Sequence, residues 1–185
     1  MSGGHDAPPE ATPQAAAGLE QAWKILQLVD EWIRHAETKL AATLVAAGVS
    51  GGALFNLVRA QDETSLYFDI VAVLCCTAVI LSGVAAMVGL YPVLKSSALA
   101  EDDEVNLVFF GDIDRAHRID ASGYRRELHA LTAHPDELAR HLNRQIHANS
   151  VVAGKKFRWA TFAIRSLLVE LLALGGLAMV IALGL

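Results

Sequence analysis

The stretch from residue 95 to residue 158 gathers the side chains best suited to chemistry. Guanidinium groups bind phosphate through paired hydrogen bonds, and aromatic rings stack on nucleobases. The stretch holds ten acidic and ten basic residues, so it lacks the basic field on which binding to long nucleic acid depends. A small anionic ligand is one interpretation, and solvated helix faces or anionic lipid headgroups are the alternative. The residues concerned are Arg115, Arg118, Arg125, Arg126, Arg140, Arg144, Phe109, Phe110 and Tyr124.

Glu170 is a second candidate, because it is the only acidic residue in the apolar stretch 167–185. A carboxyl group within a membrane is energetically costly, which makes it a candidate for function by default. We consider an ion path or a contact between copies of the chain. The alternatives are that Glu170 reaches the headgroups or pairs with Arg165 or with Lys39 of a neighbouring copy.

Histidine and cysteine give no metal site. Five of the seven histidines lie in 95–158, but none forms an HExxH motif, and we interpret them, His141 among them, as solvated surface residues. Cys75 and Cys76 are adjacent within an apolar stretch and are interpreted as small apolar fillers. The chain also lacks a nucleophile elbow, a Walker loop, a dinucleotide fingerprint and a CxxC motif, so nothing indicates an enzyme.

Three long apolar stretches must position these side chains. A helix needs roughly 20 apolar residues to cross a bilayer, and 40–58, 70–94 and 159–185 each approach or exceed that length. We therefore predict an all-α membrane protein with three transmembrane helices, a hairpin at 59–69 and a sensor block at 95–158. Residues 1–18 are rich in Pro, Ala and Gly, carry no signal-peptide pattern and are predicted to be a disordered tail.

The first and third spans are predicted to extend beyond the membrane as helices. Apolar residues recur at helical spacing from 19 to 39, and no proline interrupts the chain from Pro135 to its end. We expect the two extensions to pack together as a cytoplasmic stem. Between the spans we predict an apolar run that ends at a glycine turn (Gly111), followed by a short helix at 122–131.

The distribution of lysine and arginine predicts the orientation. Ten of the 15 lie in 95–158 and three precede the first span, whereas the hairpin 59–69 holds only Arg59. The positive-inside rule then places the N-terminus and the block 95–158 in the cytoplasm and the hairpin outside. Small-residue pairs such as Gly48/Gly52 and Gly175/Gly176 let helices approach closely, and we expect a homo-oligomer in the lipid bilayer.

Three strings resemble a known family. Residues 106–113 (NLVFFGDI) resemble the N-x-x-F-F-G-D-I signature of the Pycsar transmembrane effectors. The Glu37-Thr-Lys39 string is similar to the family's acid-x-Lys motif, although the family usually has Asp at the first position. Gln145-Ile146, Asn149-Ser150 and Lys156-Phe157 are similar to the family's approach to the last span. Together the resemblance covers about residues 19–185.

The resemblance implies a multi-pass protein of the bacterial inner membrane that acts in anti-phage defence and uses no cofactor. It implies that a partner cyclase makes cyclic UMP or cyclic CMP, and that the effector responds by impairing membrane integrity in an abortive infection. For the ligand we expect contacts from Asn106, Phe109, Phe110, Asp112, Arg118 and Arg144, and for the membrane action we expect Glu170. Phe109 and Phe110 could instead plug the stem. The alternative functions are a scaffold that anchors a cytoplasmic partner without binding nucleotide and a small-ion transporter subunit.

Overall fold

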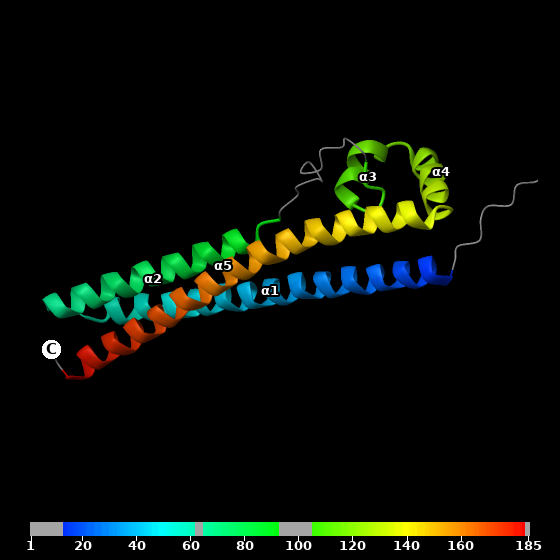
Figure 1. Cartoon of the computed structure of the whole chain (residues 1–185). Coiled ribbons are helices and arrows are strands. Elements are labelled where there is room, and N and C mark those ends of the chain that lie inside the picture. The colour runs from blue at the N-terminus through cyan, green and yellow to red at the C-terminus, as the bar shows by residue number, and fades with distance from the viewer. Residues whose placement is uncertain (1–12, 62–64, 93–104, 184–185) are drawn as a thin grey trace, which may run out of the picture. The chain divides into compact units, whose positions relative to one another are not determined.

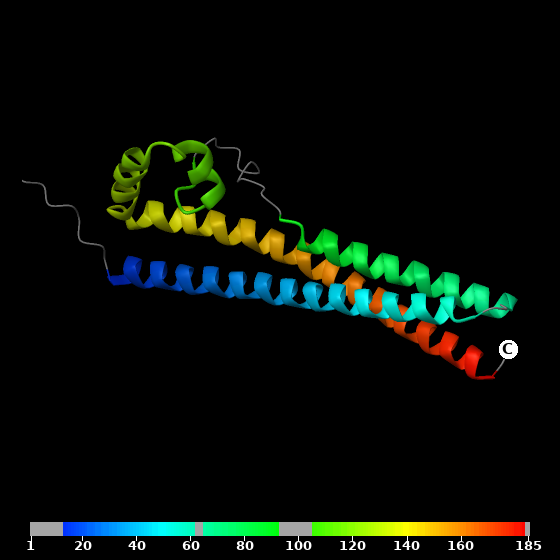
Figure 2. The same cartoon turned by 180° about the vertical axis from the view of Figure 1, so that it is seen from behind.

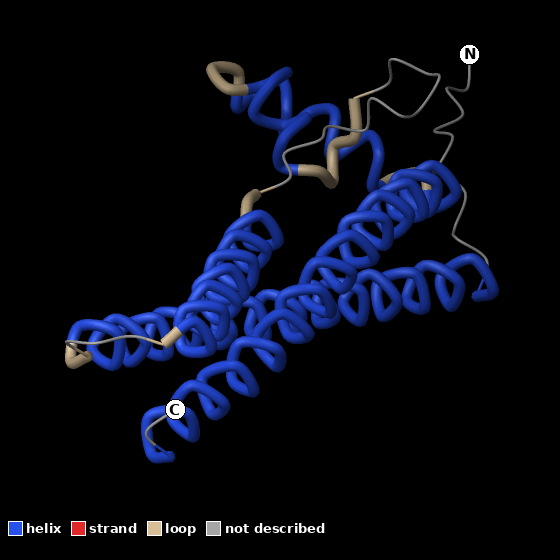
Figure 3. The backbone as a smooth tube through the Cα atoms, turned by 90° about the vertical axis from the view of Figure 1, so that its left-hand side faces the viewer, coloured by secondary structure: helices blue, strands red, loops and turns tan. Residues whose placement is uncertain are grey.

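The computed structural model describes residues 13–61, 65–92 and 105–183, and its regular elements in these ranges are all helices (Figures 1 and 3). The predicted all-α fold class is therefore confirmed. The five helices are α1 (Pro13–Arg59), α2 (Leu66–Leu90), α3 (Phe110–His117), α4 (Ala121–Thr132) and α5 (Pro135–Leu183). Three of them, α1, α2 and α5, are long and apolar enough to cross a membrane.

The two long helices begin at prolines and contain none further on. α1 has 47 residues and α5 has 49. Proline suits the first turn because its missing N–H would have no partner there. In α1 three alanines, which have the highest helix propensity, follow soon after Pro13, so residues 13–18 are helical and the prediction of a disordered tail is wrong for them. Residues 1–12 of that tail lie outside the described residues.

α2 lies four residues earlier in the chain than the predicted span 70–94. It begins after Ser65, whose hydroxyl accepts a hydrogen bond from the backbone N–H of Phe68 at 3.2 Å. It ends at Leu90 because Pro92 disfavours the helical conformation at Tyr91. Residues 93 and 94, the end of the predicted span, are outside the described part of the chain.

Two short helices precede α5. α4 confirms the helix predicted near 122–131, and Asp120 caps it by accepting the Gly123 N–H at 2.8 Å. The sequence predicts a turn at Gly111, but the structure has a helix, α3, at this position. Gly111 lies instead in the first turn of α3, where a Cβ atom would come within 2.7 Å of the Phe109 ring. A larger residue at this position would therefore force the Phe109 ring to move.

The described residues divide into two compact units, and α1 and α5 contribute to both. The α3–α4 unit comprises the described residues of 1–31 and 93–152. Its core joins Ala22 and Leu26 of α1 to Leu138 and Leu142 of α5, so the predicted packing of the two helical extensions is present. Leu107, from the segment before α3, and Leu131 of α4 complete this core.

The three-helix unit comprises the described residues of 32–92 and 153–185, and within it α2 lies beside α1 and α5 (Figures 1 and 2). One apolar cluster surrounds Leu40, and a second surrounds Leu54 and Leu177. At Gly89 an added Cβ would lie 2.7 Å from the Leu40 side chain and 2.9 Å from Trp159 Cβ, so this glycine lets the three helices approach closely. Large apolar side chains such as Val49 and Leu172 point outward, as expected for contact with lipid.

Candidate functional site

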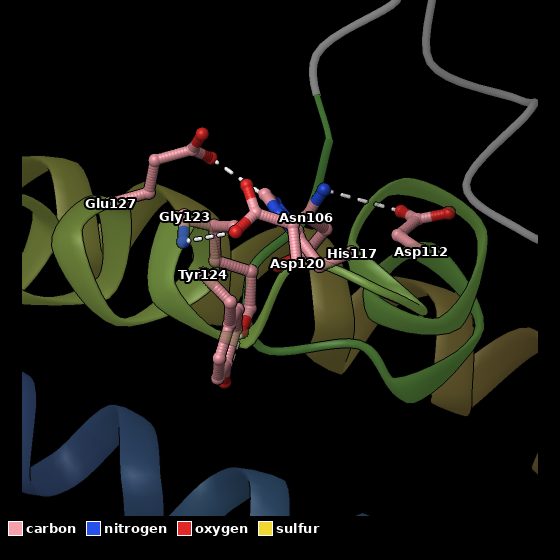
Figure 4. Close-up of polar contacts among 8 residues, drawn as sticks. Asn106, Asp112, His117, Asp120, Gly123, Tyr124 and Glu127 are labelled. Carbon is pink, nitrogen blue, oxygen red and sulfur yellow. Dashed lines mark hydrogen bonds and ion pairs between the residues drawn. The ribbon is translucent and has the colours of Figure 1, made fainter.

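Asn106 is the centre of a buried polar cluster in the α3–α4 unit, and it is only 1% exposed. Its backbone N–H donates to Asp112 Oδ2 at 3.2 Å (Figure 4), and its Oδ1 accepts the Val108 N–H at 3.1 Å. Its Nδ2 donates to the His141 carbonyl and to Gln145 Oε1, both at 3.4 Å. The segment before α3 is therefore fixed to α5 by the side chain of one asparagine.

The cluster continues through α5 to α1. Gln145 Nε2 donates to Asn149 Oδ1 at 2.9 Å, and Asn149 Nδ2 donates to Asp30 Oδ1 at 2.8 Å. These hydrogen bonds form one continuous network, which contains Asp112, Asn106, Gln145, Asn149 and Asp30. It joins residues of two of the strings noted in the sequence, 106–113 and 145–150. Asp30, Gln145 and Asn149 were not among the predicted site residues, although the four-residue spacing of 141, 145 and 149 on a helix signals one shared face.

Two histidines differ from the expected solvated state. His141 is 4% exposed, and its Nδ1 lies 3.2 Å from Asn106 Oδ1, because it shares one face of α5 with the buried Leu138 and Gln145. His117 is largely enclosed, with Nε2 3.2 Å from Glu127 Oε2 and its ring 5.7 Å from that of Tyr124 (Figure 4). Among the described residues, no group of three or more His, Cys, Asp or Glu side chains is placed to hold a metal ion.

The two adjacent phenylalanines have different surroundings. Their ring centroids are 4.9 Å apart and tilted by 54°. Phe109 is half-buried beside Gly111, which suits the interpretation of a plug, whereas Phe110 is 64% exposed. The Phe110 ring thus offers a face on which a planar ligand could stack.

The two predicted arginines have different surroundings. Arg118 forms a two-pronged ion pair with the Asp114 carboxylate, both contacts at 3.1 Å, and this exposed pair raises the pKa of Arg118. Arg144 is half-buried on α5 next to Gln145. Arg115, which was not among the predicted ligand contacts, lies 3.8 Å from Asp112. The structure therefore brings Asn106, Phe109, Phe110 and Asp112 together and leaves Arg118 engaged with Asp114.

Glu170 lies wholly inside the three-helix unit, with an exposure of 0%. Its Oε1 accepts the hydroxyl of Ser50 from α1, and its Oε2 accepts the hydroxyl of Ser82 from α2 at 2.7 Å. Of the alternatives considered for Glu170, Arg165 of the same chain has an exposed side chain, whereas the two serines supply donors to both carboxyl oxygens. Serine hydroxyls satisfy a carboxyl group without carrying a second charge into the bundle.

Lys156 is also buried, although a lysine side chain near the end of a membrane span usually extends to the lipid headgroups. Its side chain is 6% exposed, and its Nζ lies 2.9 Å from Glu37 Oε1. It also donates to the Gly89 carbonyl at 3.2 Å, one of the last carbonyls of α2, which have no partner within the helix. Lys156 therefore joins α5 to α1 through an ion pair and to α2 through a helix-end hydrogen bond.

Comparison with known proteins gives a consistent result. A family model described as a Pycsar effector protein domain matches residues 21–184. The Pycsar effector protein PtPycTM of Propioniciclava tarda is 32% identical over 173 residues, which cover 90% of this chain and 83% of that protein. The Pycsar effector protein RsPycTM of a Rhizobium species is 29% identical over 136 residues, which cover 70% of this chain and 77% of that protein. No solved structure matches the chain.

Proposed function

The chain belongs to the Pycsar effector family, and on that premise we propose that a cyclic pyrimidine mononucleotide activates it to impair the inner membrane. Membership of this family implies a role in anti-phage defence. In the proposed sequence a partner cyclase makes cyclic UMP or cyclic CMP during infection. The effector then damages the membrane, and the cell dies or stops growing before the phage matures.

One observation carries the proposal: a single helix contributes to both polar clusters. Gln145 of α5 holds Asn106 of the signature string, and Glu170 of α5 holds the serines of the three-helix unit. A ligand that favoured a different arrangement of residues 106–113 would therefore act directly on a helix that carries a membrane span. The ligand can shift this equilibrium only by its difference in affinity for the two arrangements.

The ligand contacts proposed from the sequence now divide into two groups. Asn106 and Asp112 are buried, so a nucleotide can contact them only if they exchange their present hydrogen-bond partners. In the absence of nucleotide, they position Phe109. Phe110 offers an exposed ring for the base, and Arg118 and Arg144 are the candidates for the phosphate. Replacement of the Asp114 carboxylate by a phosphate as the partner of Arg118 would cost little free energy, because exposed ion pairs contribute little to stability.

The proposed location follows from the ligand. A cyclic nucleotide made in the cytoplasm must meet its receptor there, so we place residues 95–158 and the N-terminus on the cytoplasmic side of the inner membrane. This agrees with the excess of Lys and Arg in that block. The proposed active form is a homo-oligomer, since the exposed glycines of the pairs Gly48/Gly52 and Gly175/Gly176 would let helices of neighbouring copies approach closely.

Calorimetry of the detergent-purified protein tests the ligand. We expect binding heat with cyclic UMP or cyclic CMP and none with cyclic AMP. Phe110→Ala should weaken binding about five- to hundredfold, the usual range for one lost base–aromatic stack. Phe162→Ala, an exposed phenylalanine of the three-helix unit, is the matched control and should bind as the wild type does. No heat with either pyrimidine nucleotide, together with no depolarisation when they are supplied to expressing cells, would sink the proposal.

A scaffold that anchors a cytoplasmic partner is the second candidate. The observation that favours it is the exposure of two large apolar side chains, Phe110 at 64% and Ile119 at 98%. A scaffold would use them for a protein contact and would need no nucleotide. Loss of phage protection in an Ile119→Ser variant that still binds nucleotide with wild-type heat would favour this function.

A further inference from the structure

The two serines beside Glu170 each have a second acceptor on their own helix. Ser50 Oγ lies 2.8 Å from the Ala46 carbonyl, and Ser82 Oγ lies 3.1 Å from the Val79 carbonyl. A hydroxyl group carries one proton, so each serine donates either to Glu170 or to its own backbone. Back-bonding of this kind, from serine to a carbonyl one turn earlier, is a common alternative in helices.

Separation of Glu170 from the serines therefore costs free energy mainly at the carboxyl group, not at the hydroxyl groups. When Glu170 leaves, both hydroxyl protons find an acceptor at once, and no serine remains unsatisfied. The carboxyl group has no such alternative within hydrocarbon, and it must meet water or another polar group. Movement of Glu170 out of the bundle is thus coupled to the penetration of water into the membrane.

We propose that Ser50 and Ser82 are positioning residues that hold Glu170 inside the three-helix unit at rest, and that release of Glu170 opens the membrane to ions. The inference deepens the proposed function and rests on it for the membrane action. The close approach that the arrangement needs is present, since a Cβ on Gly51, next to Ser50, would lie 3.1 Å from Val79 of α2. Cys75 adds a thiol contact to the Glu170 carbonyl at 3.7 Å.

The test uses the full-length protein in cells that lack the cyclase, with a dye that reports membrane potential. A Ser50→Ala/Ser82→Ala double variant should depolarise the cells without nucleotide, at a rate about tenfold above the wild type, because two hydrogen bonds that favour the closed state are lost. Thr77→Ala is the matched control. Its hydroxyl also lies on α2 but donates to the Val73 carbonyl at 2.8 Å and is exposed, so it should leave the membrane intact.

A triple variant separates release of Glu170 from a general packing defect. Addition of Glu170→Leu to the double variant removes the group that draws in water, so the leak should fall to the level of the Thr77→Ala control. A triple variant as leaky as the double would overturn the inference, as would a double variant that is expressed and silent. If the double variant does not accumulate in the membrane, the single variants Ser50→Ala and Ser82→Ala decide, each with a smaller leak expected.

The leak measured in the double variant does not depend on the identity of the nucleotide, so the two proposals can fail separately. A leaky double variant combined with a wild type that ignores cyclic UMP and cyclic CMP would reject the proposed ligand and retain the two serines as positioning residues. A double variant that does not depolarise the cells, combined with a wild type that responds to nucleotide, would retain the proposed ligand and reject the role of the two serines.

Discussion

Asn106 uses both kinds of polar group in its side chain at once. Its amide nitrogen donates to α5, and its amide oxygen accepts from Val108. Carboxylate and amide have nearly the same shape, but a carboxylate cannot donate. The sequence could mark Asn106 and Asp112 as unusual through the string that contains them, but it could not say that they are buried, since that depends on the face that α5 presents to residues 106–113.

Replacement of this asparagine by its closest relative tests the buried cluster. Asn106→Asp removes the amide group that donates to the His141 carbonyl and to Gln145 Oε1, and we expect a loss of about 1–3 kcal/mol in the free energy of unfolding. The measurement is thermal unfolding of the protein in detergent, followed by intrinsic fluorescence. Asn143→Asp, on the exposed face of α5, is the control and should change little. Equal transition temperatures for the two variants would contradict a structural role for Asn106.

Asp120 predicts a local dependence on pH. The hydrogen bond from the Gly123 N–H, and after it that from Ser122, lowers the pKa of the Asp120 carboxyl group. Because the folded-state pKa lies below the unfolded-state value, the cap stabilises α4 above the unfolded-state pKa, and this contribution is lost as the pH falls through the folded-state pKa. Carbon-detected NMR titration should give a midpoint below the value of about 3.9 for a free aspartate. Ser122→Ala should move the midpoint upward, and an unchanged midpoint would contradict the assignment of that hydroxyl.

The helices differ in how far the sequence predicts them. α1 and α5 follow from apolar spacing and from long intervals without proline, which are local properties. α3 could not be predicted because Gly111 indicates a turn, and only the close approach of the Phe109 ring shows why a glycine lies inside a helix. The partners of Glu170 and Lys156 depend on the rotation of three helices about their axes. That rotation is set by packing, so spacing along one helix could not give it.

The contact between α1 and α5 at Lys156 makes a prediction about charge. Lys156→Glu places two carboxylates together and removes the donor to the Gly89 carbonyl. We expect the free energy of unfolding to fall by about 2 kcal/mol. This is below the roughly 3–5 kcal/mol of a fully buried pair because Glu37 is partly exposed. A Glu37→Lys/Lys156→Glu swap should recover part of the loss in the same unfolding assay. Lys24→Glu, in the exposed pair with Glu20, should cost little. A swap no better than the single variant would show that the ion pair does not join these helices.

At the scale of the whole molecule the structure describes two units and three helices able to span a membrane, while orientation rests on charge. We propose that the region around Ala60 lies outside and that Ser122 lies in the cytoplasm. After Cys75 and Cys76 are replaced by alanine, a membrane-impermeant maleimide should label Ala60→Cys in intact cells. It should label Ser122→Cys only after the membrane is opened. The opposite pattern would invert the proposed topology and would place the proposed receptor away from its nucleotide.

Asn106 and Asp112 direct their polar atoms to their own chain, so a need for stability alone would preserve them. A genome search with N-x-x-F-F-G-D-I would then collect proteins that share a scaffold, whatever second messenger each one answers. Divergence in messenger would be recorded instead at outward positions such as Phe110, which can change without loss of a buried contact. Sorting relatives by the residue at that position, and not by the signature, would group defence systems by the signal they use.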